Sequence, residues 1–127
     1  MTERLFVYGT LMKGEPNHHE LSAAVHLGPA VTTKGFELVL MGVYPALVRG
    51  GVGVVLGELY RIDRSLLAVL DRFEGHPTLY RRRRIVLKGG STTHAYLLSR
   101  ARAQRLRPLG CPGWREYQAT RAMTTNE

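Results

Sequence analysis

Glycine-containing turns cut most of this chain into short apolar segments, and this division limits the folds that the chain can adopt. Segments with the length and composition of strands lie at 5–8, 31–41, 46–48, 52–61, 79–87 and 93–99. Two helical segments interrupt them, so strands and helices do not alternate as they do in a doubly wound fold. The sequence therefore predicts the α+β class, with a mixed sheet curled into a small barrel and flanking helices.

Two pairs of neighbouring segments are predicted to form hairpins. Gly50-Gly51 lies between 46–48 and 52–61, and Gly89-Gly90 lies between 79–87 and 93–99. Paired glycines can adopt the positive backbone angles that tight hairpin turns need. We therefore expect each pair of segments to form adjacent antiparallel strands.

Two other segments have apolar residues at helical spacing. The clearer one follows Asp63, a residue type that caps helices, and ends just before Gly75. Its apolar residues are Leu66, Leu67, Leu70 and Phe73. The second helix, of about three turns, is expected over 15–27, before Gly28 and Pro29.

The 127 residues fit one domain, with a core at about 4–99 and a C-terminal extension at 100–127. We expect Trp114 and Tyr117 to dock the extension, and residues 124–127 to be frayed. The lone Cys111 cannot form an internal disulfide and is interpreted as structural. Together with the lack of a long apolar run, this favours a cytoplasmic protein with no membrane partner.

Arginine dominates the charge of the chain, which has 18 Lys and Arg against 10 Asp and Glu and a formal net charge of +8. A net positive charge promotes encounter with anions but does not identify a fold. The block Arg81–Arg84 lies in a predicted strand, where alternation sends two of its side chains to each face. This favours a solvated strand over a phosphate-binding stripe, and we do not expect a nucleic-acid partner.

Glu74 has the most unusual predicted position of the carboxylates. It lies at the C-terminal end of the predicted helix, between Phe73 and Gly75, where the helix dipole disfavours a negative charge. This position predicts a raised pKa for Glu74, which suits general acid–base catalysis near neutral pH. The alternative is an exposed glutamate on a polar helix face.

Two further segments carry candidate binding groups. The first, Tyr8-Gly9-Thr10-Leu11, follows a strand, and successive backbone amides in such a turn can hold an oxyanion or a carboxylate. It has neither the lysine of a P-loop nor the glycine spacing of a dinucleotide site. The second holds His18, His19, Glu20 and His26, whose spacing does not match a metalloprotease site, and we expect no metal.

Six short motifs follow one another along the chain in a characteristic order. They are Phe6-Val7-Tyr8-Gly9-Thr10-Leu11, Gly14 with Asn17-His18, Tyr44-Pro45-Ala46, Gly57-Glu58-Leu59-Tyr60-Arg61-Ile62, Leu70-Asp71-Arg72-Phe73-Glu74-Gly75 and Tyr80-Arg81-Arg82. In this order and spacing, over residues 4 to about 99, the chain resembles the gamma-glutamylcyclotransferase-like family. Each motif is short, and the resemblance depends on their combination.

The resemblance implies a role for several residues. It implies a barrel-like sheet with a cavity at its rim and makes Glu74 the catalytic acid and base. The residues implied to bind the substrate are Tyr8, Gly9, Thr10, Leu11, Tyr80 and Tyr96. Asn17 and Tyr44 would belong to the cavity wall.

The reaction implied by the resemblance needs no cofactor. The α-amine of a γ-glutamyl group attacks its own γ-carbonyl, which forms 5-oxoproline and releases an amine or an amino acid. Glu74 would take a proton from the amine and return one to the leaving nitrogen. The identity of the leaving group stays open, and so does a function of another class, a noncatalytic protein that binds a small ligand or nucleic acid on the same scaffold.

Overall fold

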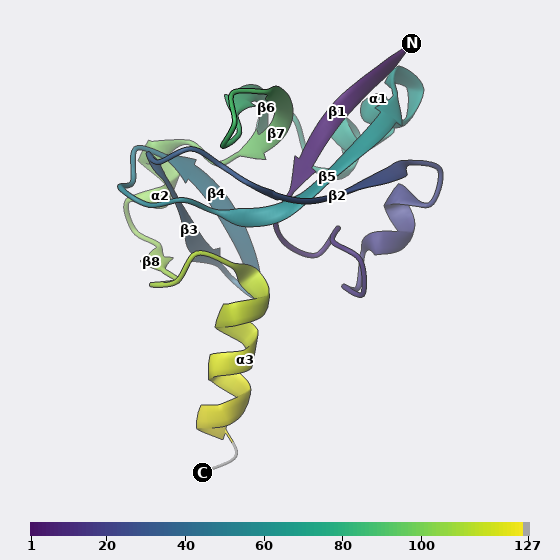
Figure 1. The fold of residues 1–127 in the computed structure, drawn as a ribbon. Coiled ribbons are helices and arrows are strands. Elements are labelled where there is room, and N and C mark those ends of the chain that lie inside the picture. The colour runs from purple at the N-terminus through teal and green to yellow at the C-terminus, as the bar shows by residue number, and fades with distance from the viewer. Residues whose placement is uncertain (126–127) are drawn as a thin grey trace.

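The computed structural model describes residues 1–125, with side chains described through residue 122. Figure 1 shows strands gathered in a curled sheet, short helices around it and a C-terminal helix that extends away from it. The strands are β1 (Thr2–Val7), β2 (Val25–Val31), β3 (Phe36–Met41), β4 (Tyr44–Arg49), β5 (Leu56–Asp63), β6 (Arg81–Val86), β7 (Thr92–Leu97) and β8 (Arg107–Pro108). The helices are the 3-10 helix η1 (His18–Leu21), α1 (Arg64–Phe73), α2 (Arg100–Ala103) and α3 (Trp114–Thr125). Among the described residues, no helix has the length and apolar character needed to cross a membrane.

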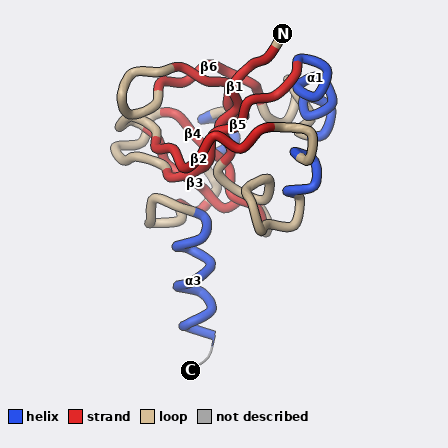
Figure 2. Tube along the Cα trace, turned by 45° about the vertical axis from the view of Figure 1, so that its right-hand side comes forward, coloured by secondary structure: helices blue, strands red, loops and turns tan. Residues whose placement is uncertain are grey.

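β1 lies inside the sheet, between β5 and β7. It pairs antiparallel with β5 over its whole length and parallel with β7, which also pairs parallel with β4. A bridge between Thr32 and Leu87 joins the chain after β2 to the chain after β6, so the sheet curls on itself (Figure 2). These findings confirm the predicted α+β class with a curled mixed sheet and flanking helices.

The core forms where β1, β4, β5 and β7 meet. Leu5, Phe6, Leu47, Tyr60 and Ala95 are at most 1% exposed. Consecutive residues of a strand point to opposite faces, so burial of both Leu5 and Phe6 means that β1 is covered on both sides. The turn that follows β1 therefore starts from a position held by packing on each face.

The helix expected over 15–27 is wrong. Only η1 is helical there, and Val25–Val31 form strand β2 along the edge of β5. The pairing contains an irregularity between His26 and Gly28, where Gly28 has a φ of +123°. Hydrogen bonding to β5 outweighs the helical spacing of the few apolar residues in this segment.

The expected hairpin between 46–48 and 52–61 is also wrong. β4 pairs instead with β3 across a turn at Gly42, whose φ is +64°, and β5 pairs with β1 and β2. The strand expected over 31–41, with an irregularity at Gly35, is fully divided there, where Gly35 has a φ of +110°, into the end of β2 and the whole of β3. Paired glycines thus mark a turn here without showing which strands it joins.

The helix predicted after Asp63 is confirmed as α1, and the hairpin across Gly89-Gly90 is confirmed as β6 with β7. Leu67 and Leu70 of α1 are buried, whereas Phe73 is 46% exposed. Asp63 occupies the N-cap position, but its side chain caps no backbone amide. Helical spacing of leucines was therefore a sounder signal than the capping residue.

The C-terminal extension is docked by its aromatic residues, as predicted. Trp114 is 6% exposed and stacks on Tyr117, with ring centroids 5.6 Å apart. Beyond them α3 runs away from the sheet (Figure 1). The expected fraying of residues 124–127 is wrong for 124 and 125, which are helical, and residues 126 and 127 lie outside the described residues.

We expect Gly57→Ala to destabilise the fold. A Cβ at Gly57 would collide with the carbonyl oxygen of Val7 and with the ring of Phe6, and both belong to the doubly covered β1. The free energy of unfolding should fall by about 2 kcal/mol, as for other overpacked cores. Urea denaturation of this variant should be compared with that of Gly53→Ala, where the nearest atom lies 3.8 Å from the added Cβ. Equal midpoints for the two variants would contradict the expectation.

Candidate active site

A cavity of about 340 Å³ lies beside the turn that follows β1. Its wall consists of Phe6, Val7, Tyr8, Gly9, Thr10, Leu11, Asn17, Met41, Tyr44, Pro45, Phe73, Glu74, Leu79, Tyr80 and Tyr96. Every site residue expected from the sequence is in this wall, namely Tyr8, Gly9, Thr10, Leu11, Glu74, Tyr80 and Tyr96, and so are Asn17 and Tyr44. The fold brings these residues to one place, and their individual roles stay predictions.

The turn in the cavity wall needs glycine at position 9 and leaves two amides free. A Cβ at Gly9 would lie 2.7 Å from Cγ of Pro45, too close for any side chain. Asn17 holds the turn, because its backbone N–H donates to the Thr10 carbonyl at 2.9 Å and its Nδ2 donates to Thr10 Oγ1 at 2.9 Å. The N–H groups of Thr10 and Leu11 donate to no acceptor in the part of the chain that the structure describes. They are therefore available to a ligand.

Glu74 reaches the cavity from the end of α1, where its N–H donates to the Leu70 carbonyl at 2.8 Å. Partial burial of its side chain raises the pKa of the Glu74 carboxyl to about 7. No donor among residues 1–122 forms a hydrogen bond to this carboxyl, so nothing offsets the cost of burying its charge. The predicted rise in the pKa of Glu74 is confirmed. Its cause is burial, however, whereas the sequence argument relied on the helix dipole.

Three tyrosines complete the polar part of the wall. The Tyr8 hydroxyl donates to the Tyr96 carbonyl at 2.7 Å, and the Tyr96 hydroxyl donates to Asp71 Oδ1 at 2.8 Å. Tyr80 has no hydroxyl partner among the described residues. Burial, and then the nearby charge of Glu74, raises the pKa of Tyr80, and burial also raises the pKa of Tyr8 and Tyr96. All three keep their protons at neutral pH, and Tyr80 can donate to a ligand.

An ion pair behind the cavity ties α1 to the β6 and β7 hairpin. Arg82 binds Asp71 with both arms of its guanidinium, from Nε to Oδ1 at 2.8 Å and from Nη2 to Oδ2 at 3.1 Å. Burial opposes ionisation of Asp71, but the hydrogen bonds from Arg82 and Tyr96 lower its pKa below the ordinary value. Because Asp71 also anchors Tyr96, this pair positions both Tyr96 and the helix end that carries Glu74.

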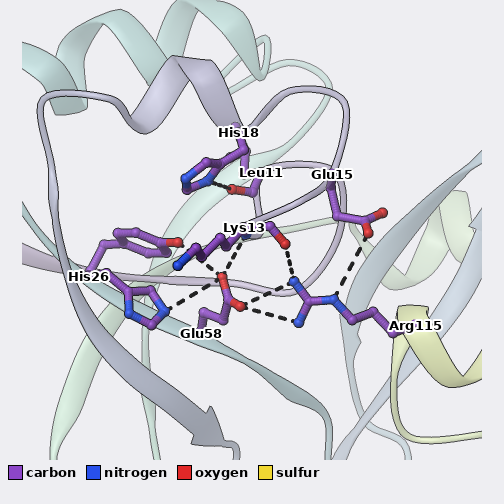
Figure 3. A network of polar contacts seen from close by, with 8 residues as sticks. Leu11, Lys13, Glu15, His18, His26, Glu58 and Arg115 are labelled. Carbon is purple, nitrogen blue, oxygen red and sulfur yellow. Dashed lines mark hydrogen bonds and ion pairs between the residues drawn. The ribbon is translucent and has the colours of Figure 1, made fainter.

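A second ion network fixes the chain just beyond the turn (Figure 3). Glu58 Oε1 accepts from the Lys13 N–H at 2.8 Å and from the Tyr60 hydroxyl at 3.0 Å, while Oε2 accepts from Arg115 at 3.2 Å. Arg115 also donates to the Lys13 carbonyl and lies 3.9 Å from Glu15. Burial opposes ionisation of Glu58, but these hydrogen bonds lower its pKa. Helix α3 thus braces the segment that supports the cavity turn.

The sequence argument assigned no role to Glu58 or Arg115. A signal was present for Glu58, since it is a carboxylate between apolar residues of strand β5, where a buried charge requires partners. Nothing in the local sequence identified Arg115 as that partner, because the two residues are far apart in the chain and meet only when α3 docks.

The histidines pack around Tyr60. The rings of His18 and His26 lie 5.9 Å and 5.1 Å from the Tyr60 ring, centroid to centroid. His26 Nε2 lies 3.9 Å from Glu58 Oε1, and His18 Nδ1 lies 3.0 Å from the Leu11 carbonyl oxygen. Within the described residues, no group of three or more His, Cys, Asp and Glu could hold a metal ion. His18 thus contacts the turn directly through the Leu11 carbonyl oxygen.

Comparison with known proteins identifies the family. The model of the family described as gamma-glutamyl cyclotransferase, AIG2-like, matches residues 5–116. The chain belongs to this family. The matched range extends beyond the expected core at 4–99 and includes Trp114 and Arg115, the residues that dock α3.

Individual relatives are similar to this chain in sequence and in fold. The chain is 44% identical over 82 residues to a putative gamma-glutamylcyclotransferase of Vibrio cholerae, covering 65% of this chain and 70% of the relative. It is 39% identical over 87 residues to gamma-glutamylaminecyclotransferase of Rattus norvegicus, covering 61% of this chain and 58% of the relative. The crystal structure of an AIG2-like protein of Mus musculus matches with a TM-score of 0.70 and 31% identity over 76% of each chain.

We expect Glu74→Gln to stabilise the protein in alkaline but not in acidic solution. The folded pKa of about 7 lies above the ordinary value of 4.5, so stability falls as the pH rises through this interval and the unfolded chain ionises first. Glutamine stays neutral and removes this loss. One pKa unit corresponds to about 1.4 kcal/mol, and solvent access through the cavity reduces the effect, so we expect a gain of roughly 1–2 kcal/mol at about pH 8.

Urea denaturation at about pH 4 and about pH 8 measures this difference. Glu37→Gln is the matched control, because Glu37 is exposed on β3 and lies outside the cavity. A gain at Glu74 that is the same at both pH values would contradict the assignment of a buried, unpaired carboxyl.

Proposed function

We propose that this protein is an enzyme that cyclises a γ-glutamyl group to 5-oxoproline and releases an amine. The observation that carries the proposal is Glu74, whose carboxyl has a pKa of about 7 and shares a small cavity with the free N–H groups of Thr10 and Leu11. A proton acceptor beside oxyanion donors suits an intramolecular acyl transfer. The names of the relatives, putative gamma-glutamylcyclotransferase and gamma-glutamylaminecyclotransferase, support the same reaction.

In this mechanism Glu74 moves protons between two nitrogens. The α-ammonium group of the substrate loses a proton to the carboxylate, and the free amine then attacks the γ-carbonyl carbon. The carbonyl π electrons move to oxygen, and they return when the bond to the leaving nitrogen breaks. Two protons pass from the α-nitrogen to the leaving nitrogen, and a carboxyl with a pKa near 7 can take up and return each of them.

The turn after β1 would stabilise the tetrahedral intermediate. The N–H groups of Thr10 and Leu11 can donate to its oxyanion, and such donors typically contribute about 3 kcal/mol each. Asn17 and Glu58 hold this turn before substrate arrives, so the donors need no rearrangement. The Tyr80 hydroxyl supplies a further donor, and the small cavity keeps the substrate curled for ring closure.

These groups supply acid–base and electrostatic catalysis, so the proposed mechanism uses no cofactor. We assign the activity to the cytoplasm, because a single cysteine that forms no disulfide suits a reducing compartment. The alternative, a noncatalytic binding protein, does not account for a buried carboxyl without a partner. Burying such a group costs stability, and perturbed carboxyls of this kind cluster at functional sites.

The rim of the cavity favours a leaving group without a carboxylate. Met41, Tyr44, Phe73 and Leu79 line the rim, and no Lys or Arg is among the described lining residues. A leaving amino acid would place its own carboxylate against this apolar surface with no cation to pair with it. We therefore propose γ-glutamyl amines as the preferred substrates.

Replacement of the proposed catalytic group should slow turnover strongly while the fold persists. We expect Glu74→Gln to lower kcat about a hundredfold or more, because glutamine cannot accept a proton. Formation of 5-oxoproline, followed by mass spectrometry, measures the rate, and circular dichroism checks the fold. The matched control Glu37→Gln should keep full activity. Unchanged turnover in the Glu74 variant would refute the proposed role.

A substrate panel tests the leaving group. We expect a γ-glutamyl alkylamine to react with a kcat/KM at least about tenfold above that of a γ-glutamyl amino acid of similar size, because only the latter has a second carboxylate, on the leaving group, that faces the apolar rim without a cation. Introducing a cation at the rim, as in Met41→Lys, should narrow this ratio. A preference for the amino acid substrate would overturn the leaving-group assignment and leave the cyclisation itself intact.

A further inference from the structure

A second hollow, of about 510 Å³, is lined largely by arginines and is separate from the Glu74 cavity. Its lining residues are Arg49, Arg81, Arg83, Arg84, Leu97, Leu98, Ser99 and Arg100. No acidic residue is among them. The hollow has the size of an ordinary small-molecule site, with leucines as its apolar part and guanidinium groups as its polar part.

The hollow forms because the side chains of the arginine block Arg81–Arg84 point alternately to the two faces of β6. Arg81 lies opposite Leu97 and Arg83 opposite Ala95, both buried residues of β7. By alternation, Arg81 and Arg83 share their face with Ile85, which is 1% exposed. The face that forms core at one end of β6 therefore presents two guanidinium groups at the other end.

Arg82 and Arg84 alternate to the opposite face of β6, where carboxylates lie near their side chains, although Arg84 also contributes to the lining of the hollow. Arg82 binds Asp71, and Arg84 Nη2 lies 3.9 Å from Glu3 Oε1. The predicted division of the arginine block between two faces is confirmed, but the two faces differ in whether carboxylates lie near the arginines. One is neutralised by acids of the fold, and the other is not.

Among the arginines that line the hollow, Arg84 has a carboxylate nearby, that of Glu3, whereas the other four have none among residues 1–122. The side chains of Arg81, Arg83 and Arg100 form no hydrogen bond or ion pair with any residue of 1–122. Arg49 is oriented, because its guanidinium lies 5.2 Å from the Phe36 ring centroid and donates to the Arg84 carbonyl at 3.3 Å. Positive charges gathered in one hollow repel one another, and an anion bound among them would relieve this repulsion.

We propose that this hollow binds a small anion with at least two adjacent phosphate groups, either free or as part of a nucleotide. Guanidinium groups bind phosphate oxygens through paired N–H donors, and several of them around one hollow match a ligand with several negative charges. Leu97 and Leu98 line the hollow but are at most 6% exposed, so the arginines supply most of its accessible polar contact. The proposal uses none of the residues assigned to cyclisation and does not depend on that activity.

Isothermal titration calorimetry of the full chain with inorganic pyrophosphate tests the proposal at about 0.15 M salt, where surface charge is screened. We expect saturable binding that weakens at least about tenfold in Arg81→Ala/Arg83→Ala. Arg4→Ala/Arg61→Ala is the matched control, because it removes the same charge from an exposed pair on β1 and β5. It should weaken binding less than about twofold. Arg100→Ala, on α2, provides a second test of the hollow with an intact β6.

Other ligands separate the alternatives. Orthophosphate should bind more weakly than pyrophosphate, because one phosphate engages fewer arginines. A nucleoside diphosphate should compete with pyrophosphate. Absence of saturable pyrophosphate binding, equal losses in the two double variants, or binding of a single-stranded oligonucleotide that pyrophosphate does not displace would each overturn the proposal.

Discussion

The pairing of β1 with β5 on one edge and β7 on the other is the constraint from which the rest of the molecule follows. β5 leads directly into α1, so the end of that helix and Glu74 are tied to the strand beside β1. β7 is joined by its hairpin to β6, which begins immediately after Tyr80. The turn after β1 therefore meets Glu74 and Tyr80 in one cavity, although they lie far apart in the sequence.

Three carboxylates show how the same fold assigns different tasks to one functional group. Burial opposes ionisation of all three, but Asp71 is held by Arg82 and Glu58 by Arg115, and both have lowered pKa values. Glu74 has no such partner, and its pKa rises to about 7. The paired carboxylates stabilise the cavity walls, and the unpaired one keeps a pKa near neutrality, which suits the proton transfer that we propose for it.

Local chemistry explains which expectations succeeded. The leucine spacing of α1 and the glycine turn between β6 and β7 each involve one short stretch of chain, and both were predicted correctly. The prediction of a helix over 15–27 was wrong because part of this segment pairs with the edge of β5. The local sequence does not show that this edge is available. The hairpin expected around Gly50-Gly51 failed for a related reason, since turn residues do not reveal which strand lies next in the sheet.

The sequence by itself determined the α+β class, the helix that carries Glu74, the glycine turn at Gly9 and the family, because these depend on residue types at short spacing. Tertiary structure alone decided that Arg115 braces the turn through Glu58, and that the arginines of β6 divide into a neutralised and an unpaired set. It also decided the cause of the raised Glu74 pKa. Burial and ion pairing are properties of three-dimensional surroundings, and residues distant in the chain supply them.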